Sequence, residues 1–376
     1  MPAASTFTEP AYHGRSLGDV LPAVATAIGI DVGFHDTSLI LPPAQKYVVF
    51  LVDGLGYELV REHRVDAPYL HSLLIHGESP ATAGVPSTTA TSLTSLGTAL
   101  TPGEHGLVGF TSRVPGTDRL LNALYWDKHV DPLEWQPNPT AFERLAGAGV
   151  HTTVVSKRQF VDSGLTVCGQ RGAAYVGADR VGERIAGVVA ASSVGPSVTY
   201  VYDGDLDWTG HRFGVDSPQW RAQLSAIDDS VEQLRETLTT DTRLVVIADH
   251  GMIDSPMTSR IDVDQFPELR DGVFLLGGEA RFRHLYCSVG ATDDVAAAWR
   301  SVLGDQALVL TRDEATERGW FGTVSDLVRP RLGDVVVAAR DEFALMSSKD
   351  FPYEMTLIGL HGSLTAREML IPILVD

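Results

Sequence analysis

The chain is poor in cysteine, in basic residues and in long apolar runs. Only two cysteines, Cys168 and Cys287, occur among its 376 residues, and they lie far apart. This argues against a disulfide framework and against a cysteine-based metal site, so we expect both to be reduced core residues. No stretch reaches the ~20 apolar residues that a bilayer-spanning helix needs.

Positive charge is scarce as well. The chain has 29 Lys and Arg residues against 48 Asp and Glu residues, a net charge of −19. This imbalance argues against a nucleic-acid groove and against binding to an anionic membrane surface, so we expect neither partner. An anionic substrate would need bound cations that offset the charge locally. The first residues lack the basic start and apolar run of a secretory signal, and we therefore expect a cytoplasmic location. The sequence leaves the oligomeric state open.

What the chain does contain is an ordinary globular composition with strands and helices in alternation. Hydrophobic residues make up 44% and charged residues 20% of it. Apolar, β-rich runs indicate buried strands at 47–52, 151–156, 197–202 and 243–248. Helical patterns indicate helices at 17–30, 68–75, 140–148, 178–191 and 217–238. The alternation predicts an α/β fold whose mostly parallel central sheet is sandwiched between helices.

The pattern changes after residue 260. Predicted strands at 282–287 and 307–310 flank a predicted helix at 293–303, which we interpret as a smaller inserted α+β cap whose ends return to the main sheet. A strand at 335–338 and a last strand at 369–375 would follow the cap. The predicted units are a lead-in at 1–45, a core at 46–260 and 333–376, and the cap at 261–332.

Carboxylates and imidazoles follow three of the predicted core strands. They are Asp53 after 47–52, Asp207 and His211 after 197–202, and Asp249 and His250 after 243–248. Ligands of open α/β sheets bind at the carboxyl ends of the strands, and a helical turn would place Asp207 and His211 on one face. Each group alone is typical of a turn or a cap. With the glycine-flanked His361, however, they supply three carboxylates and three imidazoles.

This set of side chains predicts a metal centre. Mixed nitrogen and oxygen ligands suit zinc, and six protein ligands with one shared nucleophile suit two ions. Two divalent cations can activate an attacking oxygen, hold a phosphoryl oxygen and stabilise a leaving group. We therefore predict two divalent metal ions, with zinc as the first choice, which would also offset the carboxylates locally.

A hydroxyl-rich turn at 84–99 is the other chemical feature. Pro86 precedes Ser87, Thr88 and Thr89, and small residues with leucines at helical spacing follow. A Ser/Thr cluster at the start of a helix is usually an N-cap. The alternative is a nucleophile at a helix N-terminus that helps to hold a phosphate. The residues alone leave both interpretations open for all three hydroxyls.

Five short motifs in a fixed order carry a family resemblance. They are Val-Asp-Gly at 52–54, Pro-Ser-Thr-Thr at 86–89, Asp-Trp-Thr-Gly-His at 207–211, Asp-His-Gly-Met at 249–252 and Leu-His-Gly at 360–362. The chain resembles the alkaline phosphatase superfamily, closest to the nucleotide pyrophosphatase/phosphodiesterase family. The resemblance implies one zinc held by Asp53, Asp249 and His250, and a second held by Asp207, His211 and His361. It also implies that Thr89 is the nucleophile, which bridges the metals and forms a phospho-threonine intermediate that water hydrolyses.

Two departures from the family pattern concern the substrate. Members usually carry an Asn after the nucleophile helix, but the turn at 106–110 has none, and Asn122 is a candidate further along. Ala90 to Leu93 stands where Pro-Asn-His is usual. We predict a phosphodiesterase or nucleotide pyrophosphatase for a small phosphorylated substrate. A phosphomonoesterase or phosphonate C–P hydrolase on the same centre is the alternative, and a silent metal-binding scaffold is the non-enzymatic one.

The remaining polar and aromatic candidates are interpreted as structural. We expect Lys157 and Arg158 to be a solvated loop pair. His63, His71 and His76 would be surface or packing residues, and Trp208 and Phe213 would pack rather than contact a leaving group. Residues 111–135 are predicted to form a hairpin or lid near the site.

Overall fold

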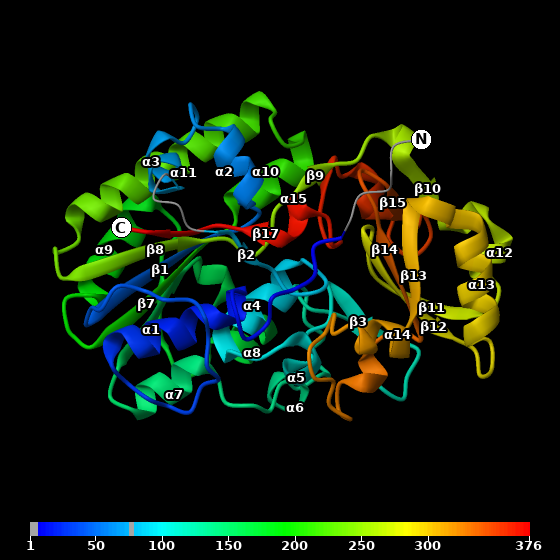
Figure 1. The fold of residues 1–376 in the computed structure, drawn as a ribbon, viewed down its shortest axis with the longest axis horizontal. Coiled ribbons are helices and arrows are strands. Elements are labelled where there is room, and N and C mark those ends of the chain that lie inside the picture. Colours follow the sequence, from blue (N-terminus) through cyan, green and yellow to red (C-terminus); the bar gives the residue numbers. More distant parts are fainter. Residues whose placement is uncertain (1–6, 75–78) are drawn as a thin grey trace.

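A computed structural model describes residues 7–74 and 79–376 and places a large α/β layer beside a smaller sheet (Figure 1). The large sheet has six strands in the order β18-β8-β1-β7-β5-β6. Their bounds are β1 (Lys46–Val52), β5 (His151–Ser156), β6 (Ala174–Gly177), β7 (Ser197–Asp203), β8 (Thr242–Ile247) and β18 (Ile373–Val375). All pairs are parallel except β18 with β8, which confirms the predicted mostly parallel sheet.

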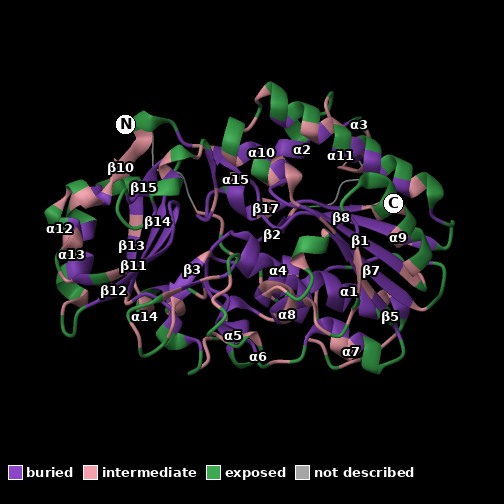
Figure 2. Ribbon diagram, turned by 180° about the vertical axis from the view of Figure 1, so that it is seen from behind, coloured by how far each residue is buried: buried purple, intermediate pink, exposed green. Residues whose placement is uncertain are grey.

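Helices cover both faces of this sheet, and buried residues fill the interior between the layers (Figure 2). One face carries α1 (Val20–Ile28), α4 (Thr89–Thr98), α7 (Ala141–Gly147) and α8 (Gly164–Gln170). The other carries α2 (Tyr57–Glu62), α3 (Pro68–Leu74), α9 (Val181–Ala191), α10 (Asp205–Phe213) and α11 (Pro218–Thr237). The predicted α/β sandwich is therefore confirmed. Ile75, the predicted end of one helix, and His76 lie outside the described residues.

Local sequence explains why α11 forms where it was predicted. The Ser217 hydroxyl accepts a hydrogen bond from the Trp220 backbone N–H at 3.1 Å, and Pro218 occupies the first helical turn. Trp220, Leu224 and Ile227 begin an apolar stripe at helical spacing that is buried against the core. None of the helices among residues 7–74 and 79–376 is long and apolar enough to cross a membrane.

The smaller sheet is antiparallel, in the order β11-β12-β14-β13. Its strands are β11 (Val273–Glu279), β12 (Phe282–Cys287), β13 (Ala307–Thr311) and β14 (Val335–Ala339). Helix α13 (Thr292–Leu303) packs on it and buries Trp299 in a second hydrophobic core. The strands and the helix predicted for the insertion are thus observed.

The predicted place of the strand at 335–338 is wrong. Strand β14 pairs with β12 and β13 inside the smaller sheet and does not return to the main one. All five of its residues are buried, like those of the core strands, and an apolar run does not reveal which sheet it joins. The smaller sheet therefore includes residues beyond 332, and the predicted core segment 333–376 begins too early.

The last predicted strand is divided in two. Within 369–375 the chain forms β17 (Leu370–Ile371), which pairs with β2 (Ala81–Thr82), and then β18. Pro372 separates them, as expected for a residue without a backbone N–H to donate.

The remaining elements are short. The helices are α5 (Pro102–His105), α6 (Pro132–Trp135), α12 (Pro267–Arg270), α14 (Arg312–Glu317) and α15 (Ala366–Met369). The strands are β3 (Thr111–Arg113), β4 (Leu120–Asn122), β9 (Ile253–Asp254), β10 (Arg260–Asp262), β15 (Ala344–Met346) and β16 (Gly359–Leu360). Strands β3 and β4 form the hairpin predicted within 111–135. Cys168 and Cys287 are buried and free, as expected.

Two buried ion pairs join the smaller sheet to the segment that leads back to the core. Arg281 contacts the Glu368 carboxylate at 2.6 Å, and both side chains are fully buried. Arg283 pairs with Glu354 in the same way. Ser363 and Thr365 also donate hydrogen bonds to Glu368. Because His361 lies between these two carboxylates in the chain, the ion pairs hold the loop that carries it.

Replacing Glu368 with alanine should lower the free energy of unfolding by about 3–5 kcal/mol, because it leaves the Arg281 guanidinium buried without a counter-charge. Denaturant unfolding measures this loss. The neighbouring Arg367→Ala is the control, since its ion pair with Glu62 is exposed and should contribute at most about 1 kcal/mol. Similar small losses from both variants would contradict the structural role of the buried pair.

Candidate metal centre

The ends of β1 and β8 bring Asp53 and Asp249 together. The strands are parallel neighbours, so the residues that follow them meet at one edge of the sheet. The backbone N–H groups of Gly54 and His250 donate to Asp249 Oδ1 at 3.1 and 3.0 Å. His250 Nε2 lies 3.4 Å from both Asp53 Oδ1 and Asp249 Oδ2. These three side chains form a buried cluster.

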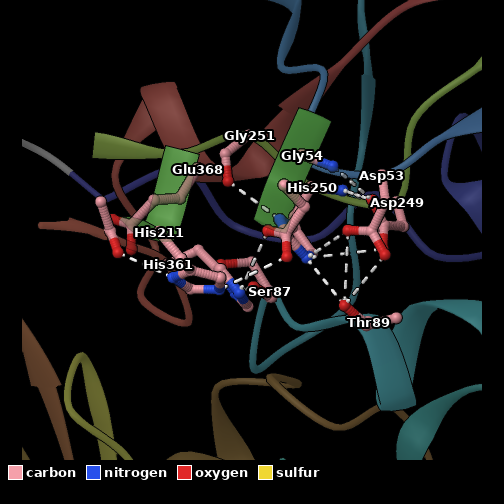
Figure 3. Close-up of polar contacts among 12 residues, drawn as sticks. Asp53, Gly54, Ser87, Thr89, His211, Asp249, His250, Gly251, His361 and Glu368 are labelled. Atoms are coloured by element: carbon pink, nitrogen blue, oxygen red, sulfur yellow. Dashed lines mark hydrogen bonds and ion pairs between the residues drawn. The ribbon is translucent and has the colours of Figure 1, made fainter. Parts of the chain in front are cut away.

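Thr89 faces this cluster from the first residue of α4 (Figure 3). Its Oγ1 lies 3.4 Å from each Asp53 carboxylate oxygen and 3.3 Å from His250 Nε2. The Ser92 hydroxyl, one turn along α4, donates to the Asp249 carbonyl at 2.8 Å. The helix is therefore held against the strand end, with the Thr89 hydroxyl directed at the carboxylates.

Asp207, His211 and His361 form the second cluster. Asp207 and His211 lie on one face of α10, as predicted, with His211 Nε2 3.4 Å from Asp207 Oδ2. His361 Nε2 lies 3.7 Å from Asp207 Oδ1. The rings of His250 and His361 stack with centroids 3.7 Å apart, so the two clusters adjoin. The structure thus brings all seven predicted site residues together.

Backbone carbonyls fix the orientation of the three imidazoles. The Nδ1 atoms of His211, His250 and His361 lie 2.8–2.9 Å from the carbonyl oxygens of Gly359, Gly251 and Ser87. A carbonyl only accepts hydrogen bonds, so each Nδ1 carries the hydrogen and a neutral ring has its lone pair on Nε2. Metal-binding histidines are usually oriented by such contacts. All three Nε2 atoms are directed at the carboxylates.

The side chains of both clusters fit bound cations. Asp207 Oδ1 and Asp249 Oδ2 are buried and have no hydrogen-bond partner, and a cation would satisfy both. Ligand atoms of Asp207, His211 and His361 lie within 4.8 Å of one another, as do those of Asp53, Asp207 and His250. Carboxylate oxygens and neutral imidazole nitrogens are the donors that zinc accepts. These residues could therefore hold divalent metal ions.

The electrostatics of the two clusters also favours bound cations. Burial, reinforced by Asp249 and Asp207, raises the pKa of Asp53 well above its usual range. Burial likewise raises the pKa of Asp249 to about 7. Burial and the neighbouring His250 and His211 rings hold the pKa of His361 well below its usual value. Without a cation, the carboxyls of Asp53 and Asp249 and the His361 imidazole therefore disfavour their charged forms.

The neighbouring hydroxyls of the turn do not cap α4. Thr88 occupies the N-cap position, but no side chain makes the capping hydrogen bond. The Ser87 hydroxyl instead donates to the Ser363 carbonyl at 2.6 Å, and the Thr88 hydroxyl hydrogen-bonds the Glu279 carboxyl. Neither side chain therefore caps α4, and both instead contact other parts of the chain.

Three functional contacts were absent from the sequence predictions. The Tyr202 hydroxyl donates to Asp53 Oδ2, Ser92 anchors Asp249, and Glu279 lies beside Thr88. Tyr202 could have been found, because it pairs with Leu51 in the sheet register and Asp53 lies two residues beyond Leu51 on the same face. Nothing in the sequence connects Glu279 with Thr88.

A cavity of about 630 Å³ opens onto Thr89 and the second cluster. Its wall includes the aromatic side chains of Phe110, Tyr125, Trp208 and Tyr353. Trp208 is 55% exposed in this wall and packs against Phe213 and Arg212, so the expectation that it packs and does not contact a leaving group stays a prediction. Asn122 is not among the lining residues, and its Oδ1 instead accepts hydrogen bonds from the backbone of Leu124 and Tyr125. It thus shapes the turn that presents Tyr125 to the cavity.

The other polar candidates make structural contacts. Lys157 pairs with Asp205, and Arg158 pairs with Asp179 and Glu183 at the surface, as expected for a solvated pair. His63 packs on Trp220 beside Asp66, and His71 contacts the Val60 carbonyl. Phe213 packs edge-on against Trp208.

Comparison with known families gives a match over most of the chain. A sequence profile described as "Type I phosphodiesterase / nucleotide pyrophosphatase" matches residues 47–364, most of the chain. The chain belongs to this family. The resemblance drawn from the five motifs is therefore confirmed.

Curated relatives match over short segments. Human ectonucleotide pyrophosphatase/phosphodiesterase family member 7 is 35% identical over 74 residues, which cover 18% of this chain and 16% of the relative. GPI ethanolamine phosphate transferase 3 of Schizosaccharomyces pombe is 30% identical over 80 residues, or 21% and 8% of the two chains. The matches thus span well under two thirds of these relatives.

Solved structures share the fold over most of the chain. Murine ectonucleotide pyrophosphatase/phosphodiesterase 5, in an inactive form with alanine in place of a threonine and in complex with AMP, superposes with a TM-score of 0.70 at 18% identity. The human protein 5 gives a TM-score of 0.67, also at 18% identity. Each match covers 88% of both chains. At this identity the likeness concerns the fold.

Proposed function

We propose that the protein is a metal-dependent phosphodiesterase or nucleotide pyrophosphatase that acts through Thr89. The observation that carries the proposal is the Thr89 hydroxyl, held at the start of α4 within 3.4 Å of Asp53 and His250. A threonine hydroxyl is a poor nucleophile at its ordinary pKa and needs activation. Membership of the phosphodiesterase family supports this reading of the geometry.

Two zinc ions are the proposed cofactors. Asp53, Asp249 and His250 would hold one, and Asp207, His211 and His361 the other, with the Thr89 hydroxyl beside the first cluster. When bound, such ions supply Lewis-acid stabilisation of phosphoryl oxygens and lower the pKa of a coordinated hydroxyl. Tyr202, through its hydrogen bond to Asp53, and the three carbonyls behind the histidines position these side chains.

The proposed chemistry is displacement at phosphorus in two stages. The Thr89 hydroxyl loses its proton to solvent, and its oxygen forms a bond to phosphorus as the bond to the leaving oxygen breaks. The departing oxygen takes a proton from water. Water then attacks phosphorus in the phospho-threonine, the bond from phosphorus to the Thr89 oxygen breaks, and the phosphomonoester product and the Thr89 hydroxyl are released. Backbone N–H groups at the start of α4 face the phosphoryl oxygens and favour their negative charge.

A nucleotide is the substrate class that the cavity supports. The structurally similar murine protein binds AMP. The cavity here is of a size suited to a small ligand, and Phe110 and Tyr353, with ring centroids 6.1 Å apart, lie in its wall. Aromatic faces stack on nucleobases, which contributes about 1–3 kcal/mol per base.

The zinc-loaded protein should hydrolyse bis-p-nitrophenyl phosphate with a higher kcat/KM than p-nitrophenyl phosphate. Both substrates release the same nitrophenolate, so absorbance compares them directly. A higher kcat/KM for the monoester would favour a phosphomonoesterase on the same centre. Hydrolysis of neither ester would leave only the metal-binding scaffold and overturn the proposal.

Thr89→Ala should lower kcat for the diester by about 10⁴-fold and leave the metal content unchanged, because it removes the attacking oxygen but no aspartate or histidine ligand. Thr88→Ala is the matched control and should lose much less, since the Thr88 hydroxyl does not face the carboxylates of the first cluster. Steady-state kinetics and elemental analysis of both variants provide the comparison. Equal losses would contradict the assignment of the nucleophile.

A further inference from the structure

Glu279 is a buried carboxyl in the wall of the catalytic cavity to which the proposed chemistry assigns no role. It is the last residue of β11 and comes from the smaller sheet, not from the α/β core. Its side chain is only 7% exposed, and it lines the same cavity as Thr89 and His361. The smaller sheet therefore contributes an acidic group to the site.

One oxygen of this carboxyl is unused. Oε1 is buried and has no hydrogen-bond partner. The Thr88 hydroxyl and the Phe110 backbone N–H hydrogen-bond the same carboxyl, which fixes its orientation. A buried acceptor without a partner is costly, so this carboxyl carries an oxygen that no group of the described chain compensates.

The neighbours of Glu279 place it at the reacting end of the cavity. Thr88 precedes the nucleophile Thr89, and Gly362 follows the ligand His361. A Cβ at residue 362 would lie 2.8 Å from Glu279 Cγ, so the carboxyl is packed directly against this glycine. Glu279 thus lies between the two backbone segments that carry Thr89 and His361.

Glu354 in the same cavity wall provides a contrast. Its carboxylate is paired with the Arg283 guanidinium, which also hydrogen-bonds the Leu345 carbonyl. No ion pair of this kind is observed for Glu279 among the described residues. Two charged neighbours shift its pKa: Arg283 of β12 lowers it, and Glu354 of the 352–356 turn raises it. Burial raises the pKa of Glu279 to about 8, so the carboxyl is ionised in mildly alkaline solution.

We propose that Glu279 is a specificity-determining residue that selects monoanionic phosphodiesters over dianionic phosphomonoesters. It lines the cavity beside Thr88, Thr89 and His361, where the phosphoryl end of the substrate would bind, and its negative charge disfavours a second charge there. This inference rests on the proposed function and assigns the smaller sheet a part in substrate choice.

The physical basis is the difference of one charge between the two ester classes. A phosphodiester carries one negative charge, whereas a monoester above neutral pH carries two. Inside a protein, two like charges several ångströms apart repel strongly enough to change a binding ratio about tenfold. A diester presents an esterified oxygen in place of the second charge, so Glu279 repels it less.

The test is the ratio of kcat/KM for bis-p-nitrophenyl phosphate to that for p-nitrophenyl phosphate, measured at pH 9 in zinc-loaded protein. Glu279→Gln keeps the size and polarity of the side chain and removes its charge, so the ratio should fall about tenfold. Misfolded protein lowers both rates equally and leaves the ratio unchanged. A purely structural Glu279 would therefore not alter it.

Glu342→Gln is the matched control. It removes one negative charge from an exposed residue in a different cleft and should keep the wild-type ratio. An unchanged ratio in Glu279→Gln, or an equal fall in both variants, would overturn the role of Glu279. A wild-type protein that cleaves neither ester would instead overturn the proposed function, so the two failures are distinguishable.

Discussion

The structure depends on the crowding of three carboxylates and three imidazoles at one edge of a parallel sheet. Asp53 and Asp249 are almost completely buried, and Asp207 lies next to both histidines of the second cluster. Such a concentration of acidic groups is unfavourable in a low-dielectric interior unless cations compensate it. Bound divalent cations would compensate it, and on the proposed function they would also let a chain with a net charge of −19 bind an anionic substrate.

The fold provides the rigid positions that such a centre needs. Strands β1 and β8 hold one cluster, α10 and the loop after β16 hold the other, and α4 aims Thr89 at the first. The buried pairs of Arg281 with Glu368 and of Arg283 with Glu354 attach the smaller sheet to the loop of His361. That sheet in turn places Glu279 in the cavity. The insertion is thus part of the site and not only a cover.

The positions of site residues could be predicted from the sequence where a local pattern determines them. Parallel strands end at a common edge, so the residues after 47–52, 197–202 and 243–248 could be expected to meet. The placement of Asp207 and His211 on one helix face followed from their spacing alone. Val335–Ala339 could not be placed, because a fully apolar strand suits either sheet. Glu279 could not be found, because its contact with Thr88 spans nearly 200 residues and depends on how the two sheets pack.

We propose that the two clusters hold two metal ions beside the Thr89 hydroxyl. Anomalous diffraction above and below the zinc absorption edge, on crystals of the zinc-loaded protein, tests it most directly. Two zinc peaks are expected, one among Asp53, Asp249 and His250 and one among Asp207, His211 and His361. A single peak, or zinc bound away from these residues, would contradict it.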